Sequence, residues 1–105
     1  MKITDIKNYR SARNHYVIVE TDEGIYGLGE GTLHTREAAV EGCIANMRDY
    51  LIGHDPMRIE HLWQDVFRGT FWRGGPVLQS ALSAIDMALW DIKGKALNTP
   101  VYNLL

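Results

Sequence analysis

The sequence predicts an α+β fold, in which a three-stranded antiparallel β-meander is followed by a three-helix bundle. The first observation is a series of short β-branched and aromatic clusters, separated by turn residues, up to about residue 29. The second is that apolar residues recur at helical spacing from about residue 40 to residue 97. Strands followed by helices are typical of the α+β class rather than of a parallel sheet with alternating helices. The length of 105 residues suits one domain.

Three strands are expected in the first third of the chain. Residues 2–9 mix Ile, Thr and Tyr with polar neighbours, and after a polar connection at 11–14 residues 16–19 form a dense β-branched run. Residues 21–24 have the composition of a tight reversal, and residues 25–29 continue as a third strand that contains two glycines. The three strands form a β-meander.

The first helix is expected soon after the third strand. Apolar residues recur on one helical face between residues 40 and 51. Thr35 is a suitable N-cap, and Gly53 is placed to end the helix.

Two further helices complete the predicted bundle. Asp55 and Pro56 offer an N-cap followed by a proline in the first turn, so we expect the second helix to begin there and to end near Gly69. The third helix is expected over about 77–97, where small and apolar residues form a broad face. Such a face indicates a deeply packed helix.

The composition excludes several classes of partner. The 11 basic and 13 acidic residues are interspersed and give a net charge of −2, so there is no basic stripe for nucleic acid. The sequence has no apolar run long enough to cross a bilayer and no signal-peptide pattern at its start. We therefore expect a folded cytoplasmic protein that binds neither nucleic acid nor membrane. Its lone cysteine, Cys43, falls among apolar helix positions and is given no catalytic role.

Several residue clusters resemble known chemical motifs, but their spacing does not match them. A dinucleotide-binding reading that starts from Gly27 and Gly29 fails, because the third glycine would fall at Thr32; the glycines instead predict the close approach of another backbone. Asp86 and Asp91 are five residues apart, so they do not share a helix face, and structural ion pairs or exposure are expected. The four histidines lack metal-ligand spacing. No catalytic or metal-binding residue is predicted.

The meander brings two polar connections to one end of the sheet. Strand direction alternates, so the first connection and the exit from the third strand leave from the same end. Arg13, Asn14 and His15 therefore lie close to His34 and Thr35, near the start of the first helix, where anionic groups are favoured. This rim would suit a small molecule that bears a carboxylate; the alternative is a polar loop edge that faces water.

A third candidate region is the loop at residues 68–76, which combines aromatic residues and arginines with glycines. Trp72 and Arg73 could reach a ligand or a neighbouring subunit. Alternatively, Phe71 and Trp72 fill the gap between helices.

Four segments of the sequence resemble the N-terminal region of the enolase superfamily, namely residues 21–30, 51–56, 73–76 and 83–96. The resemblance covers essentially the whole chain and is most specific in the last segment. Within the superfamily the sequence looks most like the mandelate racemase and muconate lactonizing enzyme type, particularly the acid-sugar dehydratases that act on galactonate or mannonate.

This resemblance implies that residues 1–97 form a capping domain and that residues 98–105 begin the connection to a TIM-barrel domain. Such barrels hold Mg²⁺ and the Lys or His bases that abstract the proton α to a carboxylate, and in dehydratases a β-hydroxyl then leaves. The parent protein would be a lyase that acts on sugar acids and forms homo-oligomers, whereas the 105-residue chain alone would be inactive.

The resemblance also implies which residues approach the substrate. Capping domains of this superfamily close over it with the loops that correspond to residues 11–15 and 32–35. Mannonate dehydratases carry Asn-Gly where this sequence has His34 and Thr35, so the two differ at this loop. His34 is the foremost candidate for contact with a substrate hydroxyl or carboxylate. Two alternatives remain open: a racemase or cycloisomerase of the same superfamily, and a non-catalytic module for protein interaction or oligomerisation.

Overall fold

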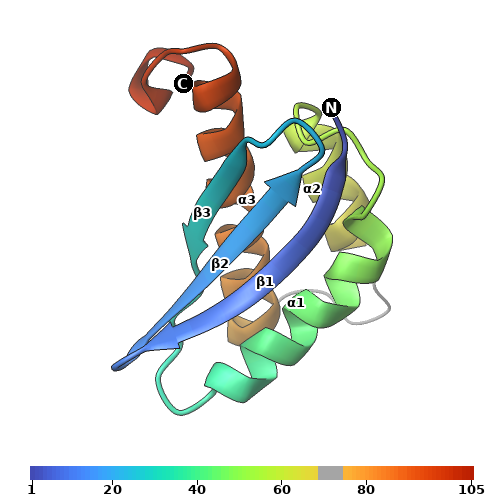
Figure 1. The fold of residues 1–105 in the computed structure, drawn as a ribbon. Coiled ribbons are helices and arrows are strands. Elements are labelled where there is room, and N and C mark those ends of the chain that lie inside the picture. Colours follow the sequence, from blue (N-terminus) through green and yellow to red (C-terminus); the bar gives the residue numbers. More distant parts are fainter. Residues whose placement is uncertain (69–74) are drawn as a thin grey trace.

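A computed structural model describes residues 1–68 and 75–105 (Figure 1). In these ranges a three-stranded sheet precedes the helices, which confirms the predicted α+β class. The elements in chain order are β1 (Ile3–Ser11), β2 (Asn14–Thr21), β3 (Tyr26–Glu30), α1 (Glu37–Leu51), α2 (Ile59–Arg68), α3 (Pro76–Ala96) and a short 3-10 helix, η1 (Val101–Asn103).

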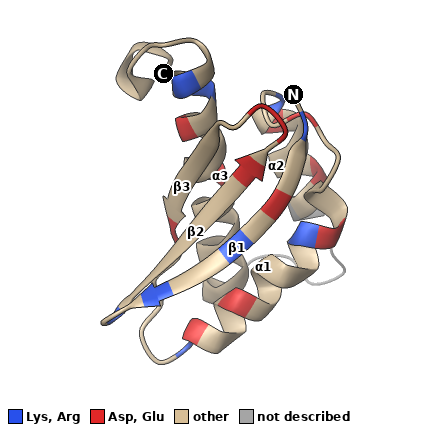
Figure 2. Cartoon of the chain, in the orientation of Figure 1, with Lys and Arg blue, Asp and Glu red and all other residues tan. Residues whose placement is uncertain are grey.

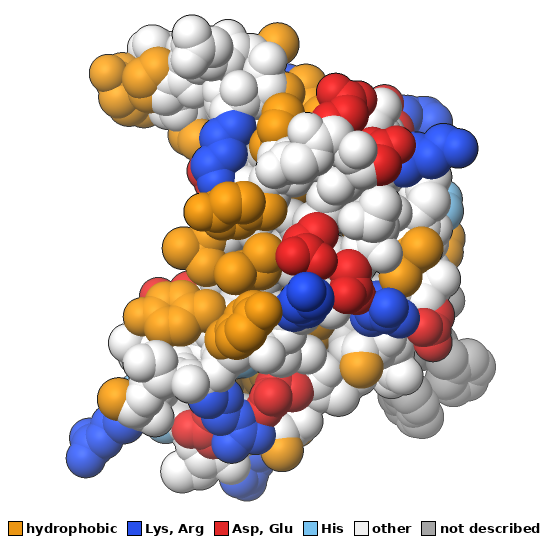
Figure 3. Space-filling model, in the orientation of Figure 1, with side chains coloured by type: hydrophobic (Ala, Val, Ile, Leu, Met, Phe, Trp, Pro, Cys, Tyr) orange, Lys and Arg blue, Asp and Glu red, His pale blue; other side chains and the backbone are white. Residues whose placement is uncertain are grey.

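The strands form an antiparallel sheet in the order β1-β2-β3, with one face against the helices and the other exposed (Figure 1). Ile6, Val17 and Val19 point to the helical side and are buried. Apolar side chains also gather over the opposite face, where they are visible in Figure 3. The exposed or half-buried apolar residues of that face are Tyr9, Tyr16, Ile18, Tyr26 and Leu28.

One hydrophobic core lies between the inner face of the sheet and helices α1, α2 and α3. Its fully buried large side chains include Ile3, Val17, Val19, Val40, Ile44, Leu51, Leu62, Leu82 and Ile92. Each such Leu or Ile contributes about 1.5–3 kcal/mol by leaving water. This burial holds the helices against the sheet. It therefore also sets the position of the polar connections at the end of the sheet.

Two glycines of β3 allow α3 to pack directly against the strand. A Cβ added at Gly27 would lie 1.9 Å from the backbone oxygen of Ala88, and one added at Gly29 would lie 1.9 Å from that of Ala84. Both distances are far inside van der Waals contact, so only glycine fits. The predicted close approach of another backbone is therefore confirmed, and α3 supplies that backbone.

Helix α1 ends as predicted but begins differently. Its last residue is Leu51, and Gly53 follows with φ of 90°. Thr35 was expected as the N-cap, but Arg36 occupies that position and no side chain caps the helix. The reason is the left-handed backbone of Thr35, whose φ is 68°, whereas an N-cap residue needs an extended backbone. The peptide N–H of Thr35 instead donates to the Glu37 carboxylate at 3.3 Å.

Helix α2 begins later than predicted. The sequence pattern placed its start at Asp55 and Pro56, whereas the helix starts at Ile59. The Asp55 carboxylate accepts a hydrogen bond from the N–H of Met57 at 2.9 Å, and the Asp55 carbonyl accepts one from the N–H of Arg58 at 3.2 Å. These bonds form a separate turn, because an Asp side chain can satisfy the backbone in a non-helical conformation. Helix α3 spans Pro76–Ala96, close to the prediction.

The open edge of β3 is covered by side chains from α3. The Asp91 carboxylate accepts from the N–H of Leu28 at 2.9 Å, and the Lys95 ammonium donates to the carbonyl of Tyr26 at 2.7 Å. Asp91 and Lys95 also form an ion pair at 3.2 Å. The structural ion pair predicted for Asp91 is thus confirmed, and it satisfies two backbone groups of an edge strand that another chain could otherwise pair with. Asp86 is half-buried, and burial raises the pKa of its carboxyl.

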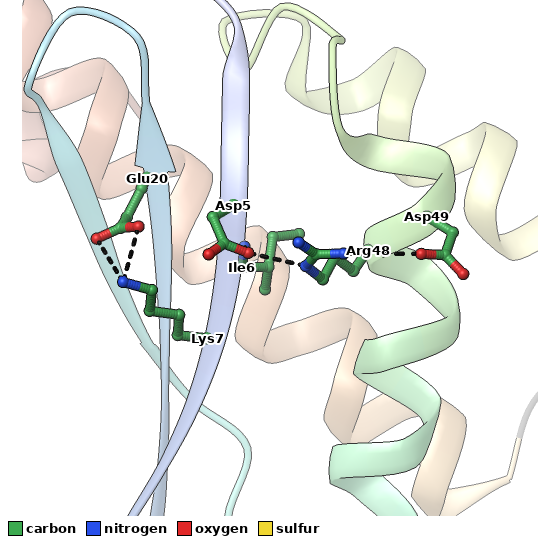
Figure 4. A network of polar contacts seen from close by, with 6 residues as sticks. All are labelled: Asp5, Ile6, Lys7, Glu20, Arg48 and Asp49. Carbon is green, nitrogen blue, oxygen red and sulfur yellow. Dashed lines mark hydrogen bonds and ion pairs between the residues drawn. The ribbon is translucent and has the colours of Figure 1, made fainter.

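A polar network joins β1 to α1 (Figure 4). The Arg48 guanidinium donates to the Asp5 carboxylate at 2.8 Å, and the N–H of Ile6 donates to the same oxygen at 2.8 Å. The hydrogen bond from Arg48 lowers the pKa of Asp5, because it favours the charged carboxylate. Beside this network, Lys7 and Glu20 pair across the strands at 3.2 Å. Within residues 1–68 and 75–105, no helix has the length and hydrophobicity needed to cross a membrane.

Candidate functional site

The first connection of the sheet is a tight hairpin. Ser11 pairs with Asn14, so only Ala12 and Arg13 lie outside the strands, and Ala12 adopts the left-handed backbone with φ of 55°. The polar connection expected at 11–14 is therefore shorter than predicted, because its outer residues extend the two strands. Arg13 and Asn14 are exposed at this tip, and the Asn14 amide donates to the Tyr16 hydroxyl at 3.1 Å.

The hairpin and the exit from β3 meet at one end of the sheet. The N–H of Gly31 donates to the carbonyl of His15 at 3.0 Å, and the N–H of His15 donates to the Thr32 hydroxyl at 2.9 Å. The Thr32 hydroxyl in turn donates to the Glu30 carboxylate at 2.7 Å. The rim, which we define as residues 11–15 and 30–35, is thus joined by direct hydrogen bonds.

His15 occupies a different place from the one expected for a rim donor. Its side chain is 0% exposed, and its Nε2 lies 2.8 Å from the Asn8 Oδ1 of β1. Side chains alternate along a strand, so Asn14 points outward and His15 points toward the helices. In this geometry a dissolved ligand does not reach the imidazole.

His34 and Thr35 are both exposed in the turn between β3 and α1. Close to this turn, Arg10 of β1 forms an ion pair with Glu41 of α1. The pKa of Glu37 is lowered chiefly by a hydrogen bond from its own peptide N–H, with smaller effects from the N–H of Thr35 and from nearby positive charge. The turn therefore combines hydrogen-bonding side chains with a carboxylate that stays charged.

A groove of about 300 Å³ adjoins this end of the sheet and shares Glu30, Gly31 and Thr32 with the rim. One wall is the exit of β3, and the other is the first part of α3. The lining residues are Glu30, Gly31, Thr32, Pro76, Gln79, Ser80 and Ser83. Of the two serines that α3 contributes, Ser83 is exposed and Ser80 is half-buried beside the groove. Ser80 and Ser83 are three residues apart, which places both on one helix face. This spacing is the feature of the sequence that indicates a shared polar surface.

Two predicted site residues, Trp72 and Arg73, lie outside the described residues. The described chain resumes at Gly75, whose φ of 85° precedes the start of α3.

The described residues carry exposed polar side chains of both charges. Positive and negative side chains are interspersed over the ribbon in Figure 2. Residues 1–68 and 75–105 contain no group of three or more His, Cys, Asp or Glu side chains that could hold a metal ion. Exposed Arg13, Asn14 and His34 can donate hydrogen bonds to carboxylate and hydroxyl oxygens.

A meander backed by three helices, with two polar loops joined at one end of the sheet, is the architecture of a capping domain of the enolase superfamily. The chain belongs to the family described as mandelate racemase / muconate lactonizing enzyme, N-terminal domain, which matches residues 4–105.

Curated relatives include two D-galactonate dehydratases. The protein from Pectobacterium atrosepticum is 54% identical over 106 aligned residues, which cover 100% of this chain and 28% of that protein. The protein from Ralstonia nicotianae is 52% identical with the same coverage. The chain thus spans about 28% of the length of these relatives.

Solved structures share the fold closely. An enolase from Pantoea ananatis with bound D-gluconate and Mg has a TM-score of 0.94 and 47% identity, over 98% of this chain and 26% of that chain. A member of the enolase superfamily from Salmonella Typhimurium has a TM-score of 0.92 and 38% identity, over 98% of this chain and 29% of that chain.

Proposed function

We propose that this chain is the substrate-capping domain of a Mg²⁺-dependent acid-sugar dehydratase. The observation that carries the proposal is the 54% identity to a D-galactonate dehydratase across the whole of this chain. The fold shared with an enolase that binds D-gluconate and Mg supports the same class of substrate. The remainder of the protein is a barrel domain, of about 200 residues or more, that begins after residues 98–105.

The metal and the proton-transferring groups belong to that barrel. In this proposal the barrel binds the ion. Among residues 1–68 and 75–105 no group of three or more His, Cys, Asp or Glu side chains could hold a metal ion. When bound, Mg²⁺ stabilises the negative charge that develops on the substrate carboxylate as the α-proton leaves. The 105-residue chain alone has no turnover in this proposal.

The rim of this chain orients the substrate and excludes water. Arg13 is an exposed cation on a tight hairpin and suits a carboxylate or several hydroxyls. Asn14, His34 and Thr35 are exposed neighbours that hydrogen-bond to sugar hydroxyls. Trp72 and Arg73 remain proposed contacts on the basis of the sequence alone.

The test is a turnover assay of the full-length protein with Mg²⁺ and separate samples of D-galactonate, D-gluconate and D-mannonate. The expected result is loss of water from at least one of these acids, seen as a new keto-acid product. Exchange of the α-proton with deuterated solvent, without formation of a keto acid, would instead support a racemase. The absence of both reactions for all three acids would contradict the proposal.

A non-catalytic interaction module is the second candidate, and one observation favours it. Tyr26 is 51% exposed and Leu28 is 48% exposed on the outer face of the sheet, and exposed apolar side chains of this kind can contact another protein. We infer that the whole protein is a cytoplasmic homo-oligomer. Light scattering coupled to size exclusion of the full-length protein measures the assembly, and a monomer at micromolar concentration would contradict that inference.

A further inference from the structure

His15, the buried residue of the rim, is held by three hydrogen bonds to two other segments of the chain. Its ring nitrogen Nε2 lies 2.8 Å from Asn8 Oδ1. Its N–H donates to the Thr32 hydroxyl at 2.9 Å, and its carbonyl accepts from the N–H of Gly31 at 3.0 Å. His15 is therefore the point where β1, β2 and the segment after β3 are connected.

The direction of the ring hydrogen bond follows from its partner. A carboxamide oxygen can only accept, so His15 Nε2 carries the proton that is donated to Asn8 Oδ1. The other ring nitrogen, Nδ1, is buried and has no hydrogen-bond partner among the described residues. A Cβ added at Gly31 would lie 3.2 Å from Nδ1, so a side chain at that position would crowd the ring.

Thr32 links the buried His15 to the surface of the protein. Its hydroxyl accepts from the buried backbone of His15 and donates to Glu30 at 2.7 Å. Thr32 also lines the groove of about 300 Å³ between the exit of β3 and the start of α3. A shift of Thr32 would move the chain that leads to His34 and Thr35, while a shift of His15 would move the neighbouring hairpin tip.

We propose that His15 is a positioning residue that fixes the separation between the hairpin tip and residues 32–35, and that it acts on the substrate through Thr32 rather than by contact. The inference rests on the proposed function, because it assigns the two loops to substrate binding. His15 is 0% exposed, which disfavours direct contact with the substrate. The proposal therefore gives His15 an indirect role.

The test uses Thr32→Val in the full-length protein, with Thr21→Val as the matched control. Valine keeps the shape of threonine but removes the hydroxyl, so Thr32→Val loses the bonds to His15 and Glu30. Thr21 lies at the opposite end of β2, and its hydroxyl donates to the carbonyl of Ile25 at 2.6 Å. Both variants remove a threonine hydroxyl that forms hydrogen bonds beside the sheet, but only Thr32 lies at the rim.

For Thr32→Val we expect KM for the sugar acid to rise by about five- to tenfold while kcat stays within about twofold, because binding energy is lost without loss of chemistry. Thr21→Val leaves both constants unchanged. Equal effects of the two variants on KM would overturn the proposal, since a general loss of stability would then explain them.

A second pair of variants addresses the imidazole itself. His15→Gln keeps a side-chain N–H that can donate to Asn8, whereas His15→Leu removes it and leaves the Asn8 oxygen unpaired. We expect KM to rise more for His15→Leu than for His15→Gln. The same KM in both variants would overturn the role assigned to the ring.

Amide hydrogen exchange separates this proposal from the proposed function. If the wild-type protein turns over none of the sugar acids, the proposed function fails. The exchange experiment still measures whether His15 and residues 31–32 are held together. Thr32→Val then speeds exchange at the amides of His15 and Gly31, whereas Thr21→Val does not. Unchanged exchange at both amides in Thr32→Val would overturn the positioning role.

Discussion

At the scale of single residues, Arg13 is the exposed cation of the hairpin tip. We expect Arg13→Gln to raise KM for the sugar acid by about three- to tenfold, with kcat within about twofold, because a charged hydrogen bond to the bound carboxylate or hydroxyls is weakened. Steady-state kinetics of the full-length protein measure both constants. Arg58→Gln is the control, since Arg58 is exposed in the turn near the start of β1. An unchanged KM in Arg13→Gln, or an equal rise in both variants, would contradict this role.

The Asp5 and Arg48 pair gives a pH-dependent prediction. The pKa of Asp5 is lowered in the folded protein from about 3.8, chiefly by the hydrogen bond from Arg48. A lowered pKa means that the folded state holds its proton less tightly than the unfolded state. The stabilisation is therefore fully present above the unfolded pKa and is lost as the pH falls through the folded pKa.

The variant that tests this pair is Asp5→Asn, which keeps an oxygen for the N–H of Ile6 but loses the charge. We expect it to reduce the free energy of unfolding by about 0.5–1 kcal/mol at neutral pH, since the pair is partly exposed. The difference from wild type should vanish in acid, when Asp5 itself is neutral. Denaturant titrations at several pH values measure it. Asp49→Asn, at a longer and more exposed contact with Arg48, should have almost no effect at any pH.

Residue-level roles were predicted unevenly from the sequence. The positions of Arg13, His34 and Thr35 at one end of the sheet followed from alternating strand directions. The inward direction of His15 did not, because the sequence pattern placed the strand at residues 16–19 and side chains alternate predictably only within a strand, which the structure extends back to Asn14. The polar Asn14 gives no sign that it already belongs to β2.

At the scale of elements, the contact between β3 and α3 is the most demanding part of the fold. We expect Gly29→Ala to reduce the free energy of unfolding by about 3 kcal/mol or more, because the added Cβ meets the backbone oxygen of Ala84 and forces the helix away from the sheet. Thermal and denaturant unfolding of the isolated chain measure the loss.

The control for that experiment is Gly42→Ala. Gly42 lies on α1, is exposed, and has no atom near the position of an added Cβ. Alanine is the better helix former, so this variant should stabilise the chain by about 0.5–1 kcal/mol. Destabilisation by both variants to the same extent would contradict the assigned contact.

Element boundaries show where local pattern is insufficient. The three strands and three helices were predicted in the right order, because their hydrophobic periods differ. The start of α1 was wrong by one residue, and that of α2 was wrong by three. In both cases a local interaction decided the outcome: the left-handed backbone at Thr35, and the turn closed by the Asp55 carboxylate. Neither is visible in a pattern of apolar residues.

At the scale of the whole molecule, the chain supplies a rigid polar rim on an α+β scaffold. The family membership covers residues 4–105, while the chain spans about 28% of its D-galactonate dehydratase relatives. Under the proposed function, the catalytic chemistry falls to the remainder of the protein, and this domain contributes to specificity for the sugar acid.

The most direct test of this division of roles is a crystal structure of the full-length protein with Mg²⁺ and a bound sugar acid. We predict that Arg13 and at least one of His34 and Thr35 lie within hydrogen-bond distance of the sugar acid, with the imidazole of His15 still buried against Asn8. A sugar acid that contacts only the barrel, while residues 11–15 and 32–35 face bulk water, would contradict the account.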